Sequence, residues 1–234
     1  MIDFHSHILP EIDDGSGSAA ESLQMLEVSA RQGVKLIAAT PHFYAAESSP
    51  EQFLRRRAKS AGMLQKLLGP ALPQVLLGAE VCYFDGISRT EALEGLKLEG
   101  TELLLLEMPF SLWSSRMVEE VSELQGRRGT QVLLAHIERY LAFQQPAVWE
   151  SLRKQGVWMQ CNASFFLNWK TKRKALRMLR KGEIHMLGSD CHNMAARPPQ
   201  LGEAVQVIQK GLGESAWRKF DRQMLERLKA VRYP

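Results

Sequence analysis

Short apolar runs recur along the chain and predict seven buried strands, most of them followed by a segment with helical periodicity. The runs are largely continuous, which is typical of strands that are covered on both faces of a parallel sheet. We expect these strands at 2–7, 34–40, 74–81, 102–108, 131–136, 157–162 and 184–189. The helical segments are expected at 18–33, 50–68, 90–96, 115–125, 146–154, 170–181 and 201–231.

This alternation predicts an α/β fold in which the strand–helix units close into a TIM-like barrel. The alternative is an open doubly wound sheet, whose ligands gather at one switch point between strands. Candidate site residues end six different strands here, and that distribution favours a barrel, because barrel sites lie at the C-terminal strand ends. No Pro/Gly/Ser-rich linker interrupts the chain, so residues 1–234 are expected to form one domain.

Composition narrows the class of protein only slightly. The net charge is +4, which favours anionic substrates without implying nucleic acid. The most basic stretch, 170–181, is interpreted as the solvated face of a helix. Three scattered cysteines, Cys82, Cys161 and Cys191, suit a reducing compartment, and no apolar run could span a bilayer. We therefore expect a cytoplasmic protein with neither a signal segment nor a membrane span.

Imidazoles and carboxylates end most of the predicted strands. Buried groups of these types are stable at one end of a sheet only when they are paired or bound to cations. The H-x-H and D-x-H pairs also place both of their side chains on one side of an extended chain. His185 begins its strand and is expected to be structural. The pattern predicts a multinuclear metal site with candidate ligands His5, His7, His42, Glu80, Glu107, His136, Asp190 and His192.

The motifs around these residues resemble those of a known family. In chain order they read HSHILPEIDDGS from His5, TPHF from Thr40, GAEV from Gly78, LEMPF from Leu106, AHIERY from Ala135 and GSDCHN from Gly188. They are similar to the PHP superfamily and, within it, to the bacterial manganese-dependent protein tyrosine phosphatases of capsule and exopolysaccharide loci. The likeness covers nearly the whole chain and implies the PHP fold, a distorted (β/α)7 barrel.

The resemblance further implies a centre of three divalent metal ions and two arginines, Arg139 and Arg197, that clamp phosphate. A donor set of nitrogen and oxygen without thiolate suits manganese, iron or zinc better than magnesium. The residues alone do not choose among these metals, and the resemblance indicates manganese. The implied ligand sets are His5, His7, Glu80 and Asp190 for one ion, Glu80, Glu107 and His136 for a second, and Asp14, His42 and His192 for a third.

By the same resemblance, the substrate would be phosphotyrosine on the tail of an autophosphorylating bacterial tyrosine kinase. Its hydrolysis would regulate capsule or exopolysaccharide synthesis. One alternative is a histidinol-phosphate phosphatase, or a phosphatase of another small phosphomonoester, with the same metal centre. A second alternative is a non-catalytic scaffold that binds phosphotyrosine, whose signature would be the loss of bridging or clamping residues, and none is lost here. The oligomeric state is not predicted.

Three smaller features leave alternatives open. Cys191 and Arg197 have the C-x5-R spacing of cysteine-dependent tyrosine phosphatases, but the loop lacks glycine and runs into Pro198 and Pro199, so we interpret the spacing as coincidence. Asn162 could orient a phosphate or cap the following helix. Aromatic residues after the strands could line a phosphotyrosine ring or pack between loops: Phe43, Tyr44, Phe110, Trp113, Phe165 and Phe166.

Overall fold

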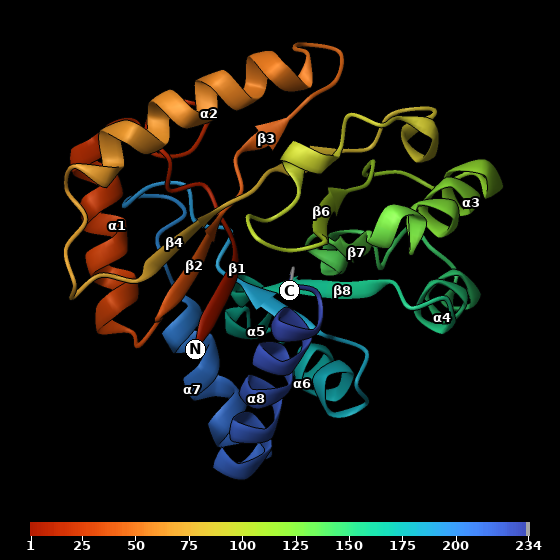
Figure 1. Cartoon of the computed structure of the whole chain (residues 1–234). Coiled ribbons are helices and arrows are strands. Elements are labelled where there is room, and N and C mark those ends of the chain that lie inside the picture. Colours follow the sequence, from red (N-terminus) through yellow and green to blue (C-terminus); the bar gives the residue numbers. More distant parts are fainter. Residues whose placement is uncertain (233–234) are drawn as a thin grey trace.

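The computed structural model describes residues 1–232 and shows strands that run parallel inside a layer of helices (Figure 1). The strands are β1 (Ile2–Ser6), β2 (Leu36–Ala39), β3 (His42–Phe43), β4 (Gln74–Leu77), β5 (Glu80–Cys82), β6 (Leu103–Glu107), β7 (Gln131–Leu134), β8 (Trp158–Asn162) and β9 (Met186–Gly188). The helices are α1 (Ala19–Arg31), α2 (Pro50–Gln65), α3 (Ser115–Leu124), α4 (Pro146–Lys154), α5 (Ala163–Leu167), α6 (Lys172–Arg180), α7 (Leu201–Leu212) and α8 (Glu214–Ala230).

Two of the predicted strands are each divided into a lower and an upper piece. β2 pairs with β4 in parallel. Their continuations β3 and β5, which lie closer to the C-terminal end of the ring, also pair in parallel. The break after β2 falls at Thr40-Pro41, where proline has no N–H to donate to a ladder. Within residues 1–232 the nine strands therefore occupy seven positions, as the apolar runs predicted.

The seven positions follow one another around a ring. The paired strands within residues 1–232 are parallel, in the orders β1-β2-β4 and β3-β5-β6-β7-β8-β9. The backbone N–H of Asp190 donates to the carbonyl of His5, and that of His7 donates to the carbonyl of Cys191, each at 2.8 Å, so β1 meets the end of β9. The ring is distorted between β4 and β6, where Glu99 donates to the Leu77 carbonyl at 2.7 Å. The predicted TIM-like barrel is confirmed.

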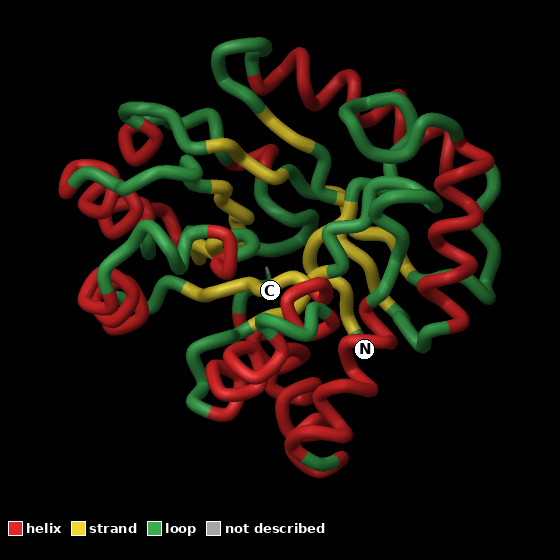
Figure 2. Tube along the Cα trace, turned by 180° about the vertical axis from the view of Figure 1, so that it is seen from behind, coloured by secondary structure: helices red, strands yellow, loops and turns green. Residues whose placement is uncertain are grey.

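Helices surround the ring, and their apolar faces pack onto the buried strands (Figure 2). Local signals fix where several begin. The Ser18 hydroxyl accepts a hydrogen bond from the Glu21 N–H and caps α1. Ser49 and Gln52 form a reciprocal capping box at α2, which opens on Pro50. Within residues 1–232, no helix combines the length and the apolar character that crossing a bilayer requires.

One helix prediction was wrong, and one stretch predicted to be helical forms two helices. Residues 90–96 form no α-helix, only short 3-10 turns at Ile87–Arg89 and Glu94–Leu96. Gly95 packs closely on α2: a Cβ there would lie 2.6 Å from a methyl of Leu54, and Arg57 donates to the Gly95 carbonyl at 3.0 Å. The stretch 201–231 is divided into α7 and α8, because Gly213 has a φ of +91° that ends the first helix. The five-residue helix α5 was not predicted.

Gly188, in β9 next to the site, has no room for a side chain. A Cβ at Gly188 would lie 2.5 Å from the Cβ of His5 and 3.0 Å from its backbone nitrogen. We expect Gly188→Ala to lower the free energy of unfolding by about 1–3 kcal/mol or more, because a rigid strand must move. Urea unfolding followed by circular dichroism measures this change.

The matched control for this substitution is Gly62→Ala in α2. Nothing lies within 4 Å of a Cβ built at Gly62, so alanine should stabilise the helix by up to about 1 kcal/mol. Equal stability of the Gly188→Ala protein and the wild type would contradict the close packing of β9 on β1.

Candidate metal centre

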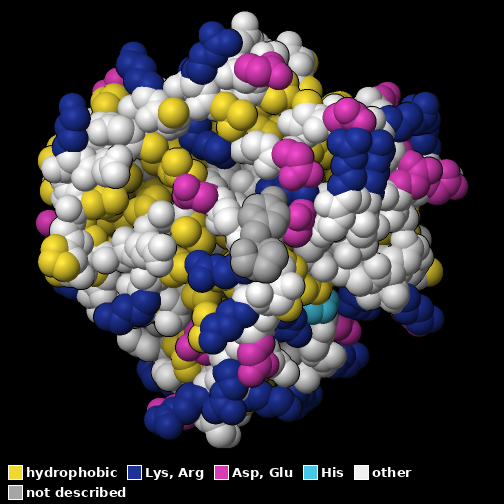
Figure 3. All heavy atoms as spheres, in the orientation of Figure 1, with side chains coloured by type: hydrophobic (Ala, Val, Ile, Leu, Met, Phe, Trp, Pro, Cys, Tyr) yellow, Lys and Arg dark blue, Asp and Glu magenta, His cyan; other side chains and the backbone are white. Residues whose placement is uncertain are grey.

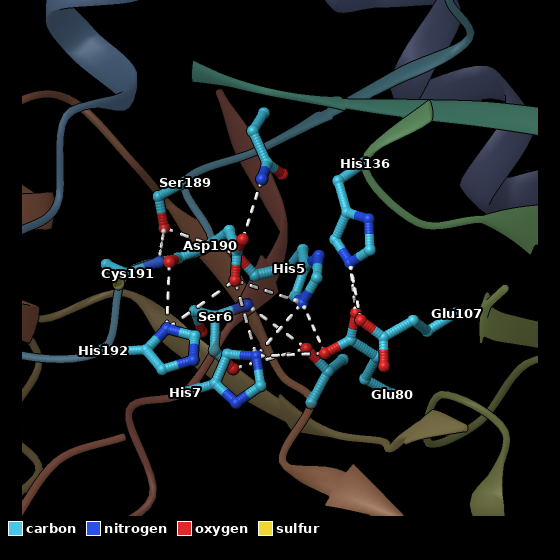
Figure 4. A network of polar contacts seen from close by, with 12 residues as sticks. His5, Ser6, His7, Glu80, Glu107, His136, Ser189, Asp190, Cys191 and His192 are labelled. Atoms are coloured by element: carbon cyan, nitrogen blue, oxygen red, sulfur yellow. Dashed lines mark hydrogen bonds and ion pairs between the residues drawn. The ribbon is translucent and has the colours of Figure 1, made fainter. Parts of the chain in front are cut away.

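Imidazole and carboxylate groups from six strand positions meet at the C-terminal mouth of the ring (Figure 4). The atoms that could hold cations form four overlapping groups, and within each group they lie within 4.8 Å of one another. Asp14 is the most exposed member, at 66%. The groups contain all nine predicted ligands: His7, Asp14, His42 and His192; His5, His7 and Asp190; His5, Glu80 and His136; and His42, Glu80 and Glu107.

Glu80 lies at the centre of these groups. Its Oε2 atom is 3.2 Å from Nε2 of His5, 3.3 Å from Nε2 of His7 and 3.0 Å from Nδ1 of His42. Its Oε1 atom is 2.7 Å from Nε2 of His136. Burial opposes ionisation of Glu80, but His5 and the hydrogen-bonding imidazoles outweigh it and hold the pKa well below its usual range. The glutamate is therefore a carboxylate that faces four imidazoles from three strand ends at once.

The same arrangement draws positive charge onto two of the imidazoles, those of His7 and His136. Burial disfavours the charged form of His7, but hydrogen bonds to Asp13 and Glu80 outweigh it and raise its pKa to about 10. Burial likewise disfavours charge on His136, but Glu107 and Glu80 raise its pKa to about 9. The carboxylates therefore make this mouth a site that attracts cations.

Unsatisfied atoms indicate which groups would take up a cation. Nδ1 of His42 and Oε2 of Glu80 are buried and lie 3.0 Å apart, but no well-aligned hydrogen bond joins them, and Nε2 of His192 is buried without a hydrogen-bond partner among residues 1–232. All three belong to predicted ligands, and a buried polar atom without a partner destabilises the fold. Nitrogen and oxygen donors of this kind suit divalent transition metals, so the residues present fit a metal centre.

Asp13 holds His7 in place, and the sequence patterns did not single it out. Its Oδ2 atom accepts a hydrogen bond from Nδ1 of His7 at 2.7 Å and another from the His42 backbone N–H at 3.0 Å. Its Oδ1 atom accepts from the Gly15 N–H at 3.0 Å. A carboxylate on the outer imidazole nitrogen fixes the tautomer and turns the other nitrogen toward the cation. The only signal in the sequence was its place beside Asp14.

Gln160 is a second residue that sequence reasoning missed. Its Oε1 atom accepts from the His136 N–H at 2.6 Å and lies 3.3 Å from Nδ1 of His5. Its amide donates to Asn162, whose own amide donates to Oδ2 of Asp190 at 2.7 Å. Asn162 makes no side-chain cap to α5 and instead orients Asp190. Polar residues at alternating positions of an otherwise apolar β8 were the available signal.

Both predicted arginines reach the carboxylate of one predicted ligand, Asp190. Arg139 forms an ion pair with Asp190, and Nη2 of Arg197 lies 2.7 Å from its Oδ2 atom. Burial raises the pKa of Asp190, but His5, His7 and Arg139 outweigh it and hold the pKa well below its usual range. The arginine side chains are 36% and 37% exposed, so each is open to the mouth.

Of the six aromatic residues that follow the strands, only Phe110 and Tyr44 lie at the mouth with substantial exposure. Phe110 is 50% exposed, and its ring stacks on His136 at 5.9 Å and on Tyr140 at 5.5 Å between centroids. Tyr44 stacks on His42 at 5.4 Å. The other four are buried and pack between loops: Phe43, Trp113, Phe165 and Phe166.

The C-x5-R segment does not form a phosphate-binding loop. Cys191 is fully buried, and burial raises the pKa of its thiol far above the usual range. The carboxamide oxygen of Asn193 accepts hydrogen bonds from the backbone N–H groups of Ala195, Ala196 and Arg197 at 3.1, 2.7 and 3.1 Å. In a cysteine-dependent phosphatase such amides would bind the phosphate, but here a side chain already occupies them.

His185 lies apart from this site. Its Nδ1 atom accepts a hydrogen bond from the Met159 backbone N–H at 3.0 Å, and Arg227 donates to its carbonyl. Burial, then Arg227 and Arg153, lower its pKa to about 4, so the ring is neutral near pH 7. No group of candidate ligands within residues 1–232 includes it.

Fold and site together define a TIM-like barrel with a metal-binding mouth, and comparisons with known proteins identify its family. A family model described as capsular polysaccharide synthesis, CpsB/CapC, matches residues 1–227, and the chain belongs to this family. It is 30% identical to the tyrosine-protein phosphatase YwqE of Bacillus subtilis, over 91% of this chain and 85% of YwqE. It is 32% identical to the tyrosine-protein phosphatase CpsB of Streptococcus pneumoniae, over 91% of each chain.

Solved structures agree with this assignment. One similar structure comes from a set of crystal structures of YwqE from Bacillus subtilis and CpsB from Streptococcus pneumoniae, which are described as metal-dependent tyrosine phosphatases. It superposes on this chain with a TM-score of 0.84 at 27% identity. It covers 100% of this chain and 98% of that chain. A lactonase from Listeria monocytogenes shares only the fold, with a TM-score of 0.59 at 12% identity over 95% and 91% of the two chains.

The geometry around Cys191 generates a prediction. We expect Cys191→Ser to keep most of the metal-dependent phosphatase activity, because the buried thiol belongs to no candidate ligand group. Asp190→Ala and His192→Ala should lose nearly all of it, since each removes a member of those groups. Initial rates with p-nitrophenyl phosphate, alongside metal content, measure the contrast. A Cys191→Ser protein that is inactive with its metals intact, together with inactivation of the wild type by alkylation, would favour a covalent mechanism.

Proposed function

We propose that this protein is a metal-dependent protein tyrosine phosphatase. The observation that carries the proposal is the mouth of the ring, where all nine predicted ligands converge and two arginines lie beside them. Family membership supports it, because the similar proteins YwqE and CpsB are named tyrosine-protein phosphatases. A phosphoryl group carries charge that cations and planar guanidinium groups can neutralise together.

We propose three divalent ions, with manganese as the physiological metal and iron or zinc as alternatives. When bound, such ions activate water at neutral pH and neutralise charge on phosphoryl oxygens. The ligand sets proposed are His5, His7, Glu80 and Asp190; Glu80, Glu107 and His136; and Asp14, His42 and His192. Some ligands lie close enough to serve two neighbouring ions. His7 also lies in the group that contains Asp14, and His42 also lies in the group that contains Glu107.

Arg139 and Arg197 are proposed to bind the phosphate. Both extend from the turns that follow ligand-bearing strands, and both contact Asp190 while staying open to the mouth. A phosphate that enters would offer each guanidinium two acceptor oxygens in its own plane, the geometry in which arginine binds anions best. Asn162 keeps Asp190 in position from the other side, so the carboxylate retains a donor when an arginine turns to substrate.

Phe110 favours an aromatic phosphoester over the alternative small substrates. Its ring lies against the predicted ligand His136, half of its surface faces outward, and the Arg139 guanidinium is 5.8 Å from its centroid. A phosphotyrosine whose phosphate reaches the metals and Arg139 would bring its own ring alongside Phe110, where aromatic pairs are favourable. Histidinol phosphate, or another small phosphomonoester, stays the alternative substrate.

A non-catalytic phosphotyrosine-binding scaffold is the weaker alternative, because Glu80 and both arginines are retained and lie close to the other candidate ligands, which supports turnover. The proposed partner is an autophosphorylating bacterial tyrosine kinase, and the proposed role is control of capsule or exopolysaccharide synthesis, which the family description supports. A cytoplasmic location, a single domain over residues 1–234 and the absence of a nucleic-acid partner stay predictions.

Chelation tests the metal dependence directly. We expect EDTA to abolish turnover of a phosphotyrosine peptide and manganese to restore it better than magnesium, because the site is rich in imidazole nitrogen. Glu80→Ala should lose metal as well as activity, since several imidazoles lose a shared carboxylate. Arg139→Ala should keep most of its metal and lose turnover or phosphate affinity. Elemental analysis measures the metal content of each variant, and steady-state kinetics measure its activity. Full activity of a metal-free Glu80→Ala protein would refute the metal mechanism.

Substrate preference tests the role of Phe110. We expect a phosphotyrosine peptide to be turned over faster than histidinol phosphate, and Phe110→Ala to raise KM for the peptide about fivefold, the worth of one aromatic pair. Phe143→Ala is the matched control, because Phe143 is also exposed, at 42%, yet makes no aromatic contact with a candidate ligand among residues 1–232. A preference for histidinol phosphate would favour the alternative substrate.

A further inference from the structure

A groove of about 250 Å³ lies on the outside of the ring between α4 and α6. Its floor is apolar and includes Ile137, Trp149 and Met178, which are all buried. Lys and Arg side chains also gather over the C-terminal helices on the face seen in Figure 3. Four basic side chains line the groove against a single acid, Glu183, and they are Arg153, Lys174, Arg177 and Lys181.

The four cations are not neutralised by the protein. Within residues 1–232 none of them forms an ion pair within 4.0 Å or donates a side-chain hydrogen bond, although Glu183 lines the same groove. Lys174, Arg177 and Lys181 also follow one another along α6 and its end at spacings of three and four residues. Like charges at these spacings repel and weaken a helix. Four cations beside a single carboxylate give the groove a positive charge that an anionic ligand would complement.

The groove and the metal centre share one connecting segment. His136, a candidate ligand, is followed directly by Ile137 in the floor of the groove. Two residues further on, Arg139 pairs with Asp190 at the mouth, and Leu141 again lines the groove. The connection between β7 and α4 therefore has one side toward the site and the other toward the groove. A single extended polypeptide could contact both.

We propose that the groove between α4 and α6 docks an acidic segment, rich in Asp and Glu, of the same polypeptide that presents phosphotyrosine to the metal centre. This inference rests on the proposed function and adds a feature of the substrate to it. The charges are complementary, two of the cations are arginines that bind carboxylates with two hydrogen bonds, and the apolar floor can receive side chains between the acids. A concave groove between helices fits an extended chain better than a flat lipid surface.

The test compares two phosphotyrosine peptides of equal length, one with a run of Asp and Glu joined by a Gly-Ser spacer and one with Asn and Gln in its place. We expect KM of the manganese-loaded wild type to be about tenfold lower for the acidic peptide, since two or more partly exposed ion pairs contribute roughly threefold each. The advantage should fall with added salt. The double variant Lys174→Gln/Arg177→Gln should lose it while kcat stays unchanged.

Lys172→Gln/Arg173→Gln is the matched control, because these residues are on the same helix, carry the same charge and do not line the groove. This control should keep the preference for the acidic peptide. Turnover of p-nitrophenyl phosphate, which has no acidic segment, should be unchanged in every variant. Equal KM values for the two peptides in the wild type, or equal losses in both double variants, would overturn the proposal. Binding of the wild type to phosphatidylserine vesicles in sedimentation assays, without binding to the acidic peptide, would also overturn the proposal.

A second measurement separates this proposal from the proposed function. Fluorescence anisotropy of the acidic peptide without phosphate reads docking alone, and we expect the wild type and the Lys172→Gln/Arg173→Gln protein to bind it about tenfold more tightly than Lys174→Gln/Arg177→Gln does. Failure of all phosphotyrosine turnover with this difference preserved would refute the phosphatase activity only. Normal turnover without the difference would refute the docking groove only.

Discussion

The electrostatics of one buried carboxylate govern the organisation of this protein. Glu80 is 1% exposed and faces four imidazoles from three different strand positions. A buried charge of this kind is stable only if cationic partners surround it, so the strand ends must converge to within hydrogen-bond distance. The parallel ring satisfies this requirement, because it brings all its C-terminal ends to one mouth. Small residues such as Gly188 then allow β9 to approach β1 closely enough.

A second layer of polar residues makes the first layer specific. Asp13 and Gln160 act on the imidazoles, while Asn162 and the two arginines act on Asp190. Each of these contacts fixes which atom of a ligand faces the centre, and this orientation commonly changes metal affinity by one or two orders of magnitude. The two arginines neutralise the buried carboxylate of Asp190 and are also accessible to an incoming anion. The charge balance of the mouth is therefore suited to a phosphoryl group.

The segment between β7 and α4 connects the site to the outer surface. It begins with His136, whose φ of +30° is unusual for a residue other than glycine, and turns at once into the 3-10 helix η4 (Ile137–Arg139). That sharp turn lets neighbouring side chains face opposite ways, some toward the metal groups and others into the groove beside α6. Asp190 also has a positive φ, of +53°, so two of the candidate ligands are presented from backbone in the left-handed region.

The sequence by itself determined the strand order, the barrel and the residue types at the mouth, because continuous apolar runs and strand-terminal ligands are local patterns. It also placed α4 from Pro146 to Lys154 as observed. The tertiary structure alone decided the rest. Contact with α2 prevented a helix at 90–96, and the roles of Asp13, Gln160 and Asn162 depend on partners that are distant in sequence or lie across a turn. The groove likewise exists only because α4 and α6 pack side by side, since no periodicity records the distance between two helices.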